Sequence, residues 1–228
     1  MHILITGAAR GLGFYLSAES VSRGHTVYAA VRSESDVGEL EKLSDKYKGF
    51  VRILRMDVAD QEQVVDGLKK VDRLDAVINN AAITMGNQDT IETLDLDFIR
   101  QTMEVNLLGP MRVVQASLPL LYKGTNAVII NISSEAGTII NAFPTNYPYA
   151  ISKTSLNMFT ERLRAFLIDR NIRVYAIHPG WMRTAMGGAT APADPTVVAG
   201  GILDILEGRT TIHSKISFID ATGRPMPL

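Results

Sequence analysis

Short apolar runs alternate with helix-like stretches from the beginning of the chain to its end. Most of these runs are apolar at successive positions, which is typical of strands buried on both faces of a parallel sheet. They occupy residues 3–6, 26–31, 51–56, 76–79, 127–132, 172–177 and 215–219, and the helices between them are expected to end near 23 and to span 36–48, 60–70, 95–122, 149–170 and 196–207. We therefore predict an α/β fold over residues 1–228. It is a single doubly wound Rossmann domain, with helices on both faces of a mostly parallel, seven-stranded sheet.

Composition and charge exclude several classes of protein. The formal net charge is −1, so no broad basic surface is expected to attract nucleic acid or an anionic membrane. The chain has no cysteine, which rules out disulfides and thiolate ligands, and its four histidines are not grouped at metal-binding spacing, so we predict no metal site. No signal-peptide pattern precedes the first apolar run, and no run approaches the roughly 20 residues that span a bilayer. We expect a cytoplasmic protein without nucleic-acid or membrane partners.

A glycine-rich segment, TGAARGLG, connects the first apolar run to the first helix. Gly7 permits a tight turn, Gly11 lets the backbone approach a pyrophosphate, and Gly13 lets helix and strand pack closely. The free N–H groups at the start of the helix then face the anion. A plain strand-to-helix turn is the alternative interpretation. The residues expected to bind a dinucleotide here are Gly7, Arg10, Gly11, Leu12 and Gly13.

The residue that follows the second run distinguishes between the two nicotinamide cofactors. An NAD site usually has an acidic residue there for the ribose hydroxyls, but this chain has Arg32, and Glu34 is the nearest acid. An arginine at this position suits a 2′-phosphate, and Arg10 can approach it from the glycine-rich segment. The two arginines therefore favour NADP(H) over NAD(H), although either one alone is compatible with an ordinary solvated surface.

Polar or small residues end the third and fourth runs. The Asp57 carboxylate can accept a hydrogen bond from the adenine amino group, or it can simply cap a turn. Small residues after the fourth run would let the ribose lie close to the backbone, and an asparagine-rich turn is the alternative. The cofactor contacts expected here are Asp57, Val58, Asn80, Ala81 and Ala82.

Tyr149 and Lys153 lie four residues apart at the start of a predicted helix, so their side chains share one face. A nearby ammonium and an oxidised nicotinamide both favour the phenolate and lower the tyrosine pKa from about 10, which makes tyrosine usable as an acid or base. By itself this is an ordinary helical pair. Ser133-Ser134 ends the fifth run, and Asn106 lies in the helix before it. A serine hydroxyl can bind a substrate carbonyl, and an asparagine can hold a proton-relay water.

The segment PGWMRT follows the sixth run and can bind a carboxamide through its backbone and a threonine hydroxyl. A strand-ending Pro-Gly turn is the alternative interpretation. The neighbouring His178 is interpreted as structural. The residues expected to contact cofactor here are Pro179, Gly180, Met182 and Thr184.

Taken in order, these motifs resemble the short-chain dehydrogenase/reductase family over nearly the whole chain. The resemblance is carried by TGAARGLG, Asp57-Val58, NNAA at 79–82 in place of the commoner NNAG, Asn106, the second serine of ISS, YAISK and PGWMRT. The short length, HPGWMRTAMGG and the ending FIDATGRPMPL are similar to the C-factor-like branch, near small NADPH carbonyl reductases.

The resemblance implies strand order 3-2-1-4-5-6-7 and hydride transfer between NADP(H) and a carbonyl or secondary alcohol. Tyr149 would donate a proton to the carbonyl oxygen, and Ser134 would orient that carbonyl, with Ser133 as the fallback. Lys153 would bind the nicotinamide ribose and lower the Tyr149 pKa. Asn106 would support the relay water.

The resemblance also implies a homodimer or homotetramer packed through the two long helices, and a substrate site built from the loops after strands four to six. Residues 185–195, where the family often has a long lid, are short and rich in Gly, Ala and Pro, so we predict a mobile, open lid. The C-factor-like features leave a second function open, a regulatory protein that binds NADP(H) with little turnover. The complete set of Ser134, Tyr149 and Lys153 argues for the enzyme.

Overall fold

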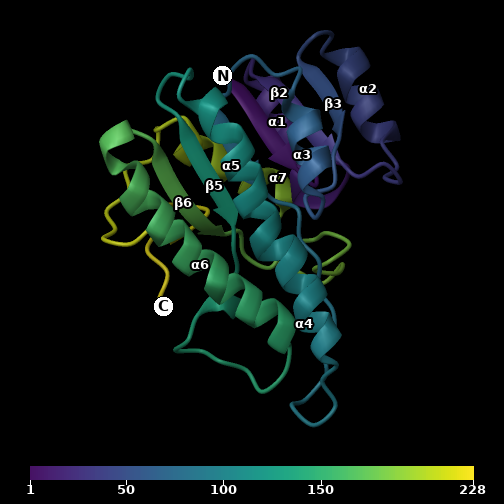
Figure 1. The fold of residues 1–228 in the computed structure, drawn as a ribbon, viewed down its shortest axis with the longest axis vertical. Helices are drawn as coiled ribbons and strands as arrows, with labels where there is room; N and C mark the ends of the chain where they lie inside the picture. Colours follow the sequence, from purple (N-terminus) through teal and green to yellow (C-terminus); the bar gives the residue numbers. More distant parts are fainter.

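The computed structural model describes residues 1–228. A seven-stranded sheet in the order β3-β2-β1-β4-β5-β6-β7 forms the centre of the molecule (Figure 1). All neighbouring strands are parallel, which is a stricter arrangement than the mostly parallel sheet predicted. The predicted strand order is confirmed. The strands are β1 His2–Thr6, β2 Thr26–Val31, β3 Val51–Arg55, β4 Ala76–Asn79, β5 Val128–Ile132, β6 Arg173–His178 and β7 Phe218–Asp220.

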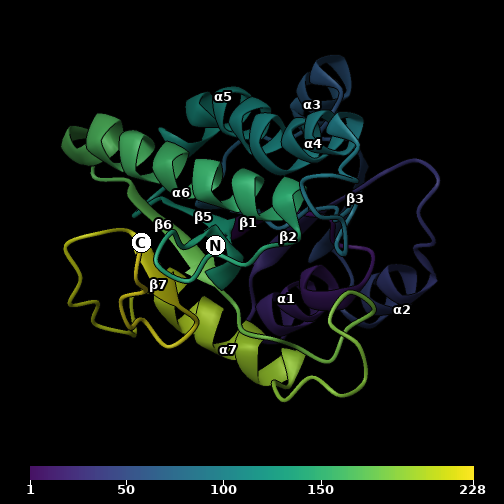
Figure 2. The same cartoon turned by 90° about the horizontal axis from the view of Figure 1, so that it is seen from below.

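Helices cover both faces of this sheet, as predicted. One apolar core joins the sheet to α1, α2 and α7, and a second core joins its other face to α3, α5 and α6, with α4 packed beside α6 (Figure 2). The central strands β4 and β5 are buried at every position, which explains why they are apolar except for Asn79 and Asn131, whose side-chain amides bond to each other. The helices are α1 Gly11–Ser22, α2 Gly38–Lys46, α3 Gln61–Leu68, α4 Leu96–Met103, α5 Gly109–Leu121, α6 Tyr147–Leu167 and α7 Pro195–Leu206.

The helical stretch predicted over 95–122 is interrupted once, by a π-helical turn at Glu104–Leu108. Pro110 follows this turn and has no backbone N–H, so the carbonyl of Asn106, four residues earlier, lacks its α-helical donor. Pro119 lies inside α5 without ending it. The sequence therefore removes the α-helical donor of one backbone carbonyl at this turn.

The last strand is shorter than the predicted 215–219. It begins at Phe218, because the N–H and hydroxyl of Ser217 donate to the Glu161 carboxylate of α6 rather than continuing a ladder. The other strands begin and end within about two residues of the prediction, the usual uncertainty of such boundaries. No helix combines the length and apolar character needed to cross a bilayer.

Candidate active site

The glycine-rich segment forms a close-packed turn between β1 and α1. Gly7 and Gly11 have φ angles of 65° and 54°, a conformation that side chains other than glycine's rarely adopt. A Cβ added to Gly13 would lie 2.3 Å from the carbonyl oxygen of Gly7, so no larger residue fits there. Leu12 is buried beneath the turn, and Arg10, the residue before α1, is exposed. The turn thus keeps the backbone bare at a helix N-terminus, as a pyrophosphate site requires.

Thr6 and Asn80 connect this turn to the end of β4. The Thr6 hydroxyl oxygen accepts hydrogen bonds from the N–H groups of Asn80 and Ala81, both at 3.0 Å. The Asn80 side-chain amide donates to the carbonyl oxygens of Thr6 and Gly7 at 2.9 and 3.2 Å. Ala81 and Ala82 remain half-buried beside the turn. The Asn80 side chain therefore shapes the cradle, and only the small residues after it leave room for a ligand.

Asp57 and Val58, which follow β3, both make contacts that stabilise the local structure. One Asp57 carboxylate oxygen accepts from the N–H of Ala59 at 2.9 Å, which is the turn-capping alternative weighed from the sequence. Val58 is buried against Gly109 of α5, so its backbone rather than its side chain is available at the site. Any adenine contact would therefore use the second Asp57 oxygen or the backbone here.

Arg32 is exposed after β2 and forms an ion pair with Glu34 at 3.0 Å. A neighbouring arginine, Arg55 at the end of β3, donates to the carbonyl oxygens of Arg32, Ser33 and Ser35 and holds this loop in place. The sequence interpretation noted Glu34 only as the nearest acidic residue and did not anticipate either contact. An exposed ion pair of this kind is weak, so a phosphate can displace Glu34 at little cost.

Ser134 and Tyr149 meet where β5 ends and α6 begins. Burial raises the pKa of the half-buried Tyr149 above its ordinary value, and the neighbouring Ser134 side chain acts more weakly in the opposite direction. Ser134 accepts from the N–H of Ala136 at 3.1 Å, which orients its hydroxyl. The Tyr149 phenol is therefore neutral at physiological pH.

Lys153 lies one helical turn after Tyr149, with its Nζ 5.4 Å from the centre of the tyrosine ring. The side chain is 2% exposed, and its ammonium group donates to the carbonyl oxygen of Ile132 at 2.7 Å. Burial lowers the pKa of Lys153 to about 7. The sequence prediction assigned Lys153 the role of lowering the Tyr149 pKa, but in this structure burial dominates for both groups.

The doubled serine of ISS divides into two roles. The Ser133 hydroxyl is buried and donates to Oδ1 of Asn157 on α6 at 2.6 Å. The Asn157 amide and the Thr154 hydroxyl both donate to the carbonyl of Gly137, at 3.4 and 3.1 Å. These contacts fasten the loop that carries Ser134 to the helix that carries Tyr149, and only Ser134 is left facing the phenol.

The Asn106 side chain is fully engaged inside the protein. Its Oδ1 accepts from the N–H of Ile83, and its amide donates to the Ile83 carbonyl and to the Ser152 hydroxyl, at 2.9, 2.9 and 3.0 Å. Both amide hydrogens are therefore already bonded within the protein. The backbone carbonyl of Asn106 is a further acceptor in this turn, and Pro110 cannot donate to it.

The PGWMRT segment after β6 packs beside the glycine-rich turn. A Cβ added to Gly11 would lie 3.8 Å from the Cβ of Thr184. The loop is closed at its base by backbone hydrogen bonds between 181–183 and Ala193, and Arg183 binds the carboxylate of Asp194 at 3.1 Å. Pro179, Gly180 and Met182 are half-buried along it. The predicted lid thus ends at Asp194, because α7 begins at Pro195, and its mobility stays a prediction.

A model of the short chain dehydrogenase family matches residues 1–194. The chain belongs to the short-chain dehydrogenase/reductase family. Among family members, it is 34% identical over 189 residues to an NADP-dependent 3-hydroxy acid dehydrogenase of Schizosaccharomyces pombe, which covers 80% of this chain and 71% of that protein. Across the curated relatives, the matched part spans 49% to 76% of their lengths.

Two solved structures resemble the whole chain. NADPH-bound carbonyl reductase from chicken fatty liver superimposes with a TM-score of 0.87 at 28% identity, covering 100% of this chain and 98% of that one. The carbonyl reductase Sniffer of Drosophila melanogaster gives a TM-score of 0.88 at 28% identity, covering 100% and 99%. The chain therefore shares the length and architecture of these small reductases, as well as the family's sequence motifs.

Sequence reasoning missed several residues that build this family site. Thr6 lay inside the glycine-rich motif, but its hydroxyl was given no role. Asn157 falls four residues after Lys153 and eight after Tyr149, a helical spacing that could have placed all three on one face. Neither role could be assigned from the sequence, because it does not show the hydrogen-bond partner. Thr6 bonds to the residue after β4, and Asn157 bonds to the residue after β5.

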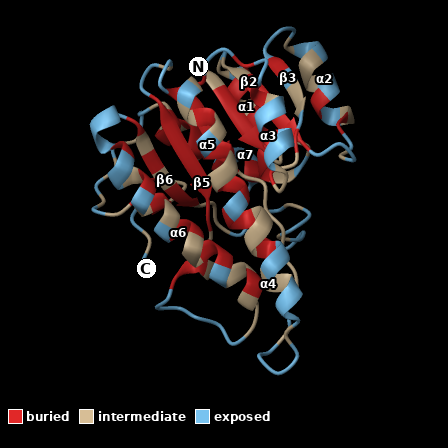
Figure 3. Cartoon of the chain, viewed as in Figure 1, coloured by how far each residue is buried: buried red, intermediate tan, exposed pale blue.

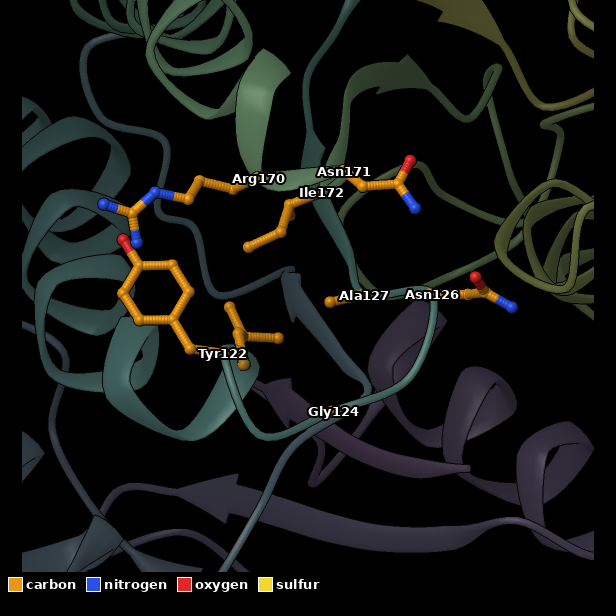
Figure 4. A pocket seen from close by; sticks show the side chains of 8 residues that line it. Tyr122, Gly124, Asn126, Ala127, Arg170, Asn171 and Ile172 are labelled. Atoms are coloured by element: carbon orange, nitrogen blue, oxygen red, sulfur yellow. The ribbon is translucent and has the colours of Figure 1, made fainter.

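A cavity of about 270 Å³ lies away from these residues, at the amino ends of β5 and β6 (Figure 4). Arg170 stacks over the ring of Tyr122 at its edge, 4.8 Å from the ring centre, and Asn126 and Asn171 lie on the far side. Since the catalytic candidates follow the carboxyl ends of the strands, this cavity is separate from them.

Proposed function

We propose that this chain is an NADP(H)-dependent oxidoreductase that interconverts carbonyl compounds and secondary alcohols, with Tyr149 as the acid and base. The observation that carries the proposal is the junction of β5 and α6, where the Ser134 side chain neighbours Tyr149 and the Nζ of Lys153 lies 5.4 Å from the centre of the same ring. The bare glycine turn fits a dinucleotide, and bound NADPH would supply the hydride. No observation favours the regulatory alternative.

The chain's own residues would handle the proton. Ser134 donates its hydroxyl hydrogen to the carbonyl oxygen and fixes its position, and Tyr149, neutral at pH 7, transfers its phenolic proton to the same oxygen. Lys153, whose pKa is near 7, can return a proton toward Tyr149. A water on the backbone carbonyl of Asn106 would resupply Lys153.

The cofactor would lie along the carboxyl edge of β1, β2 and β4, where the glycine turn provides backbone N–H groups. Arg10 and Arg32 would bind the 2′-phosphate, with Asp57 and the backbone of Val58 at the adenine. Substrate would enter between the loops after β4, β5 and β6. The remaining contacts proposed for the cofactor are Gly7, Gly11, Leu12, Gly13, Asn80, Ala81, Ala82, Tyr149, Lys153, Pro179, Gly180, Met182 and Thr184.

We also propose that the protein assembles as a homodimer or homotetramer through α5 and α6. Their outer face exposes large apolar side chains, including Met158 at 64% and Phe166 at 67%. A groove lined by residues of both helices, including Met111 and Phe159, crosses the same face. Apolar surface concentrated on one helical face supports a protein–protein contact there.

The experiment that tests the activity is a panel of neutral aldehydes and ketones assayed by NADPH oxidation at 340 nm. We expect saturable, time-dependent oxidation with at least one of them, and oxidation of the matching secondary alcohol with NADP⁺. Tight NADPH binding without turnover of any carbonyl would contradict the proposal and favour a regulatory protein.

Cofactor preference has a separate test, a titration with NADPH and NADH followed by cofactor fluorescence. Loss of a charge-assisted hydrogen bond costs about 1.5–3 kcal/mol, or roughly 10- to 100-fold in Kd. The double variant Arg10→Ala/Arg32→Ala is therefore expected to raise the Kd for NADPH by that factor and leave NADH unaffected. Arg100→Ala, an exposed arginine on α4, is the matched control. Equal affinity of the unaltered protein for both cofactors would refute the assignment of these arginines.

A further inference from the structure

Three segments after β4, β5 and β6 contain no charged side chain. They are residues 80–88, 136–152 and 184–193, in a chain of which 21% is Asp, Glu, Lys or Arg. Because the strands are parallel, all three segments lie at the same edge of the sheet. This is also the edge where Ser134 meets Tyr149. The surroundings of the proposed catalytic residues are therefore unusually poor in charge.

The segment between Ser134 and Tyr149 also exposes large apolar side chains. Ile139 is 73% exposed, and Ile140 and Phe143 are each 67% exposed, in a loop drawn as a pale blue arc below α6 in Figure 3. The loop after β6 adds Trp181 at 55% and Met186 at 58%. Contiguous exposed apolar side chains normally mark a surface that binds a ligand or partner. Their position in the loops around a reactive tyrosine favours a ligand.

The two positive charges that directly border these segments, Lys153 and Arg183, already have partners. Arg183 donates to the carbonyl oxygens of residues 191 and 192 and pairs with Asp194. Lys153 is 2% exposed and donates to the Ile132 carbonyl. Arg10 lies in the glycine turn, on the side proposed for the cofactor. Neither cation that borders the uncharged segments is therefore free for a substrate carboxylate, and the exposed Arg224 lies apart from these segments in the turn after β7.

The acidic residues that border the uncharged segments would instead repel an anion. Asp89 and Glu92 follow the first segment, and Glu135 precedes the second. His178, which lies next to Glu135, accepts the N–H of Glu135 on Nδ1 at 3.1 Å, and burial lowers the pKa of this imidazole. It is therefore neutral at physiological pH and offers an anion no charge.

We infer that the substrate is a neutral carbonyl compound with an extended apolar body, and that Ile139, Ile140 and Phe143 contact this body. The inference rests on the proposed function, because it concerns the substrate of the same site. Apolar contacts supply binding energy in proportion to the buried area, and burying one methylene is worth up to about fourfold in affinity. A carboxylate near the carbonyl would be desolvated without a partner, which is costly.

Two substrate comparisons test this inference. In a series of straight-chain aldehydes from propanal to decanal, kcat/KM with NADPH is expected to rise by two- to fourfold per methylene over part of the series. For a neutral and anionic pair of similar size, ethyl 3-oxobutanoate and 3-oxobutanoate, the ester is expected to be preferred by at least tenfold. Both assays use the unaltered full-length chain.

Substitutions of Phe143 test whether the loop between Ser134 and Tyr149 causes the preferences for chain length and for a neutral substrate. Phe143→Ser is expected to lower kcat/KM for decanal by about tenfold and to flatten the chain-length dependence. Phe143→Arg is expected to shift the ratio of 3-oxobutanoate to its ester toward the acid by at least tenfold. Phe50→Ser removes an exposed phenylalanine before β3, outside the loops that follow the strands, and is expected to change neither ratio.

The outcomes separate the two proposals. Tyr149-dependent turnover with no chain-length effect, or with a preference for the acid, would overturn the inference and leave the proposed oxidoreductase standing. No turnover of any aldehyde, ketone or acid would refute the proposed function and the inference with it. An unchanged profile in Phe143→Ser and Phe143→Arg would show that this loop does not contact the substrate.

Discussion

Replacing Tyr149 by phenylalanine is expected to lower kcat for NADPH-dependent carbonyl reduction by about 10²- to 10⁴-fold, the usual contribution of a positioned general acid. Phenylalanine keeps the ring and its packing on α6 but removes the only proton that this position can donate. The fold and the affinity for NADPH should change little. Steady-state kinetics on the most active carbonyl, together with a fluorescence titration of NADPH, would measure both effects.

The matched control for this substitution is Tyr147→Phe. Tyr147 is the first residue of α6 and is half-buried like Tyr149, two positions earlier. Side chains two residues apart in a helix point in different directions, so the Tyr147 side chain does not lie on the helix face that Tyr149 shares with Lys153. Full activity of Tyr149→Phe, or equal loss in both variants, would contradict the role assigned to Tyr149.

The direction of the Tyr149 pKa shift determines which reaction direction the free protein is prepared for. Burial raises this pKa, so the phenol stays protonated throughout the neutral range and is ready to act as an acid. The free protein is consequently better prepared for carbonyl reduction than for alcohol oxidation, which needs the phenolate. A bound, positively charged nicotinamide would favour the phenolate and thus assist the reverse reaction.

The sequence was sufficient to predict the fold because most strand positions are apolar and the apolar runs alternate with helical stretches. β4 and β5 have no exposed residue, and only a parallel sheet with two helical layers buries strands so completely. Gly7, Gly11 and Gly13 were equally informative, since their role depends on backbone conformation and close approach, which are local properties. Strand order, in contrast, came only from family resemblance.

Contacts between distant segments could not be predicted in the same way. The choice between Ser133 and Ser134 depends on Asn157, which lies on another element and takes the first hydroxyl. Asn106 was expected to support a relay water, and only the structure shows that its side chain is bonded to Ile83 and Ser152. The pattern of residue types indicates which elements meet, but the pairing of individual donors and acceptors is settled only by three-dimensional packing.

Burial of Lys153 makes the stability of the protein depend on pH. The pKa of Lys153 is lowered from 10.5 to about 7 by burial, so between these values the folded chain holds a neutral lysine while the unfolded chain binds a proton. The unfolded state therefore binds more protons, and the free energy of unfolding rises with pH. Below pH 7 the folded state bears the full cost of a buried charge, and above pH 10.5 that cost is absent.

We expect the contribution of Lys153 to the pH dependence of the unfolding free energy to disappear in the variant Lys153→Met. Between pH 7.5 and 9.5, the unfolding free energy of the unaltered protein should rise relative to the variant by about 1 kcal/mol per pH unit. The variant also loses the bond to the Ile132 carbonyl, worth about 1–3 kcal/mol, but that loss is the same at every pH and leaves the slope unaffected. Urea unfolding at a series of pH values measures the slope directly.

Lys69→Met provides the matched control, because Lys69 is 68% exposed on the surface and its removal should leave the slope unchanged. Parallel curves for Lys153→Met and the unaltered protein would show that Lys153 is charged in the folded state at all these pH values. We also expect Lys153→Met to lose carbonyl reduction, since methionine can neither bind a ribose hydroxyl nor return a proton to Tyr149. A buried lysine that destabilises the fold at neutral pH and is required for turnover has a functional rather than a structural reason to be there.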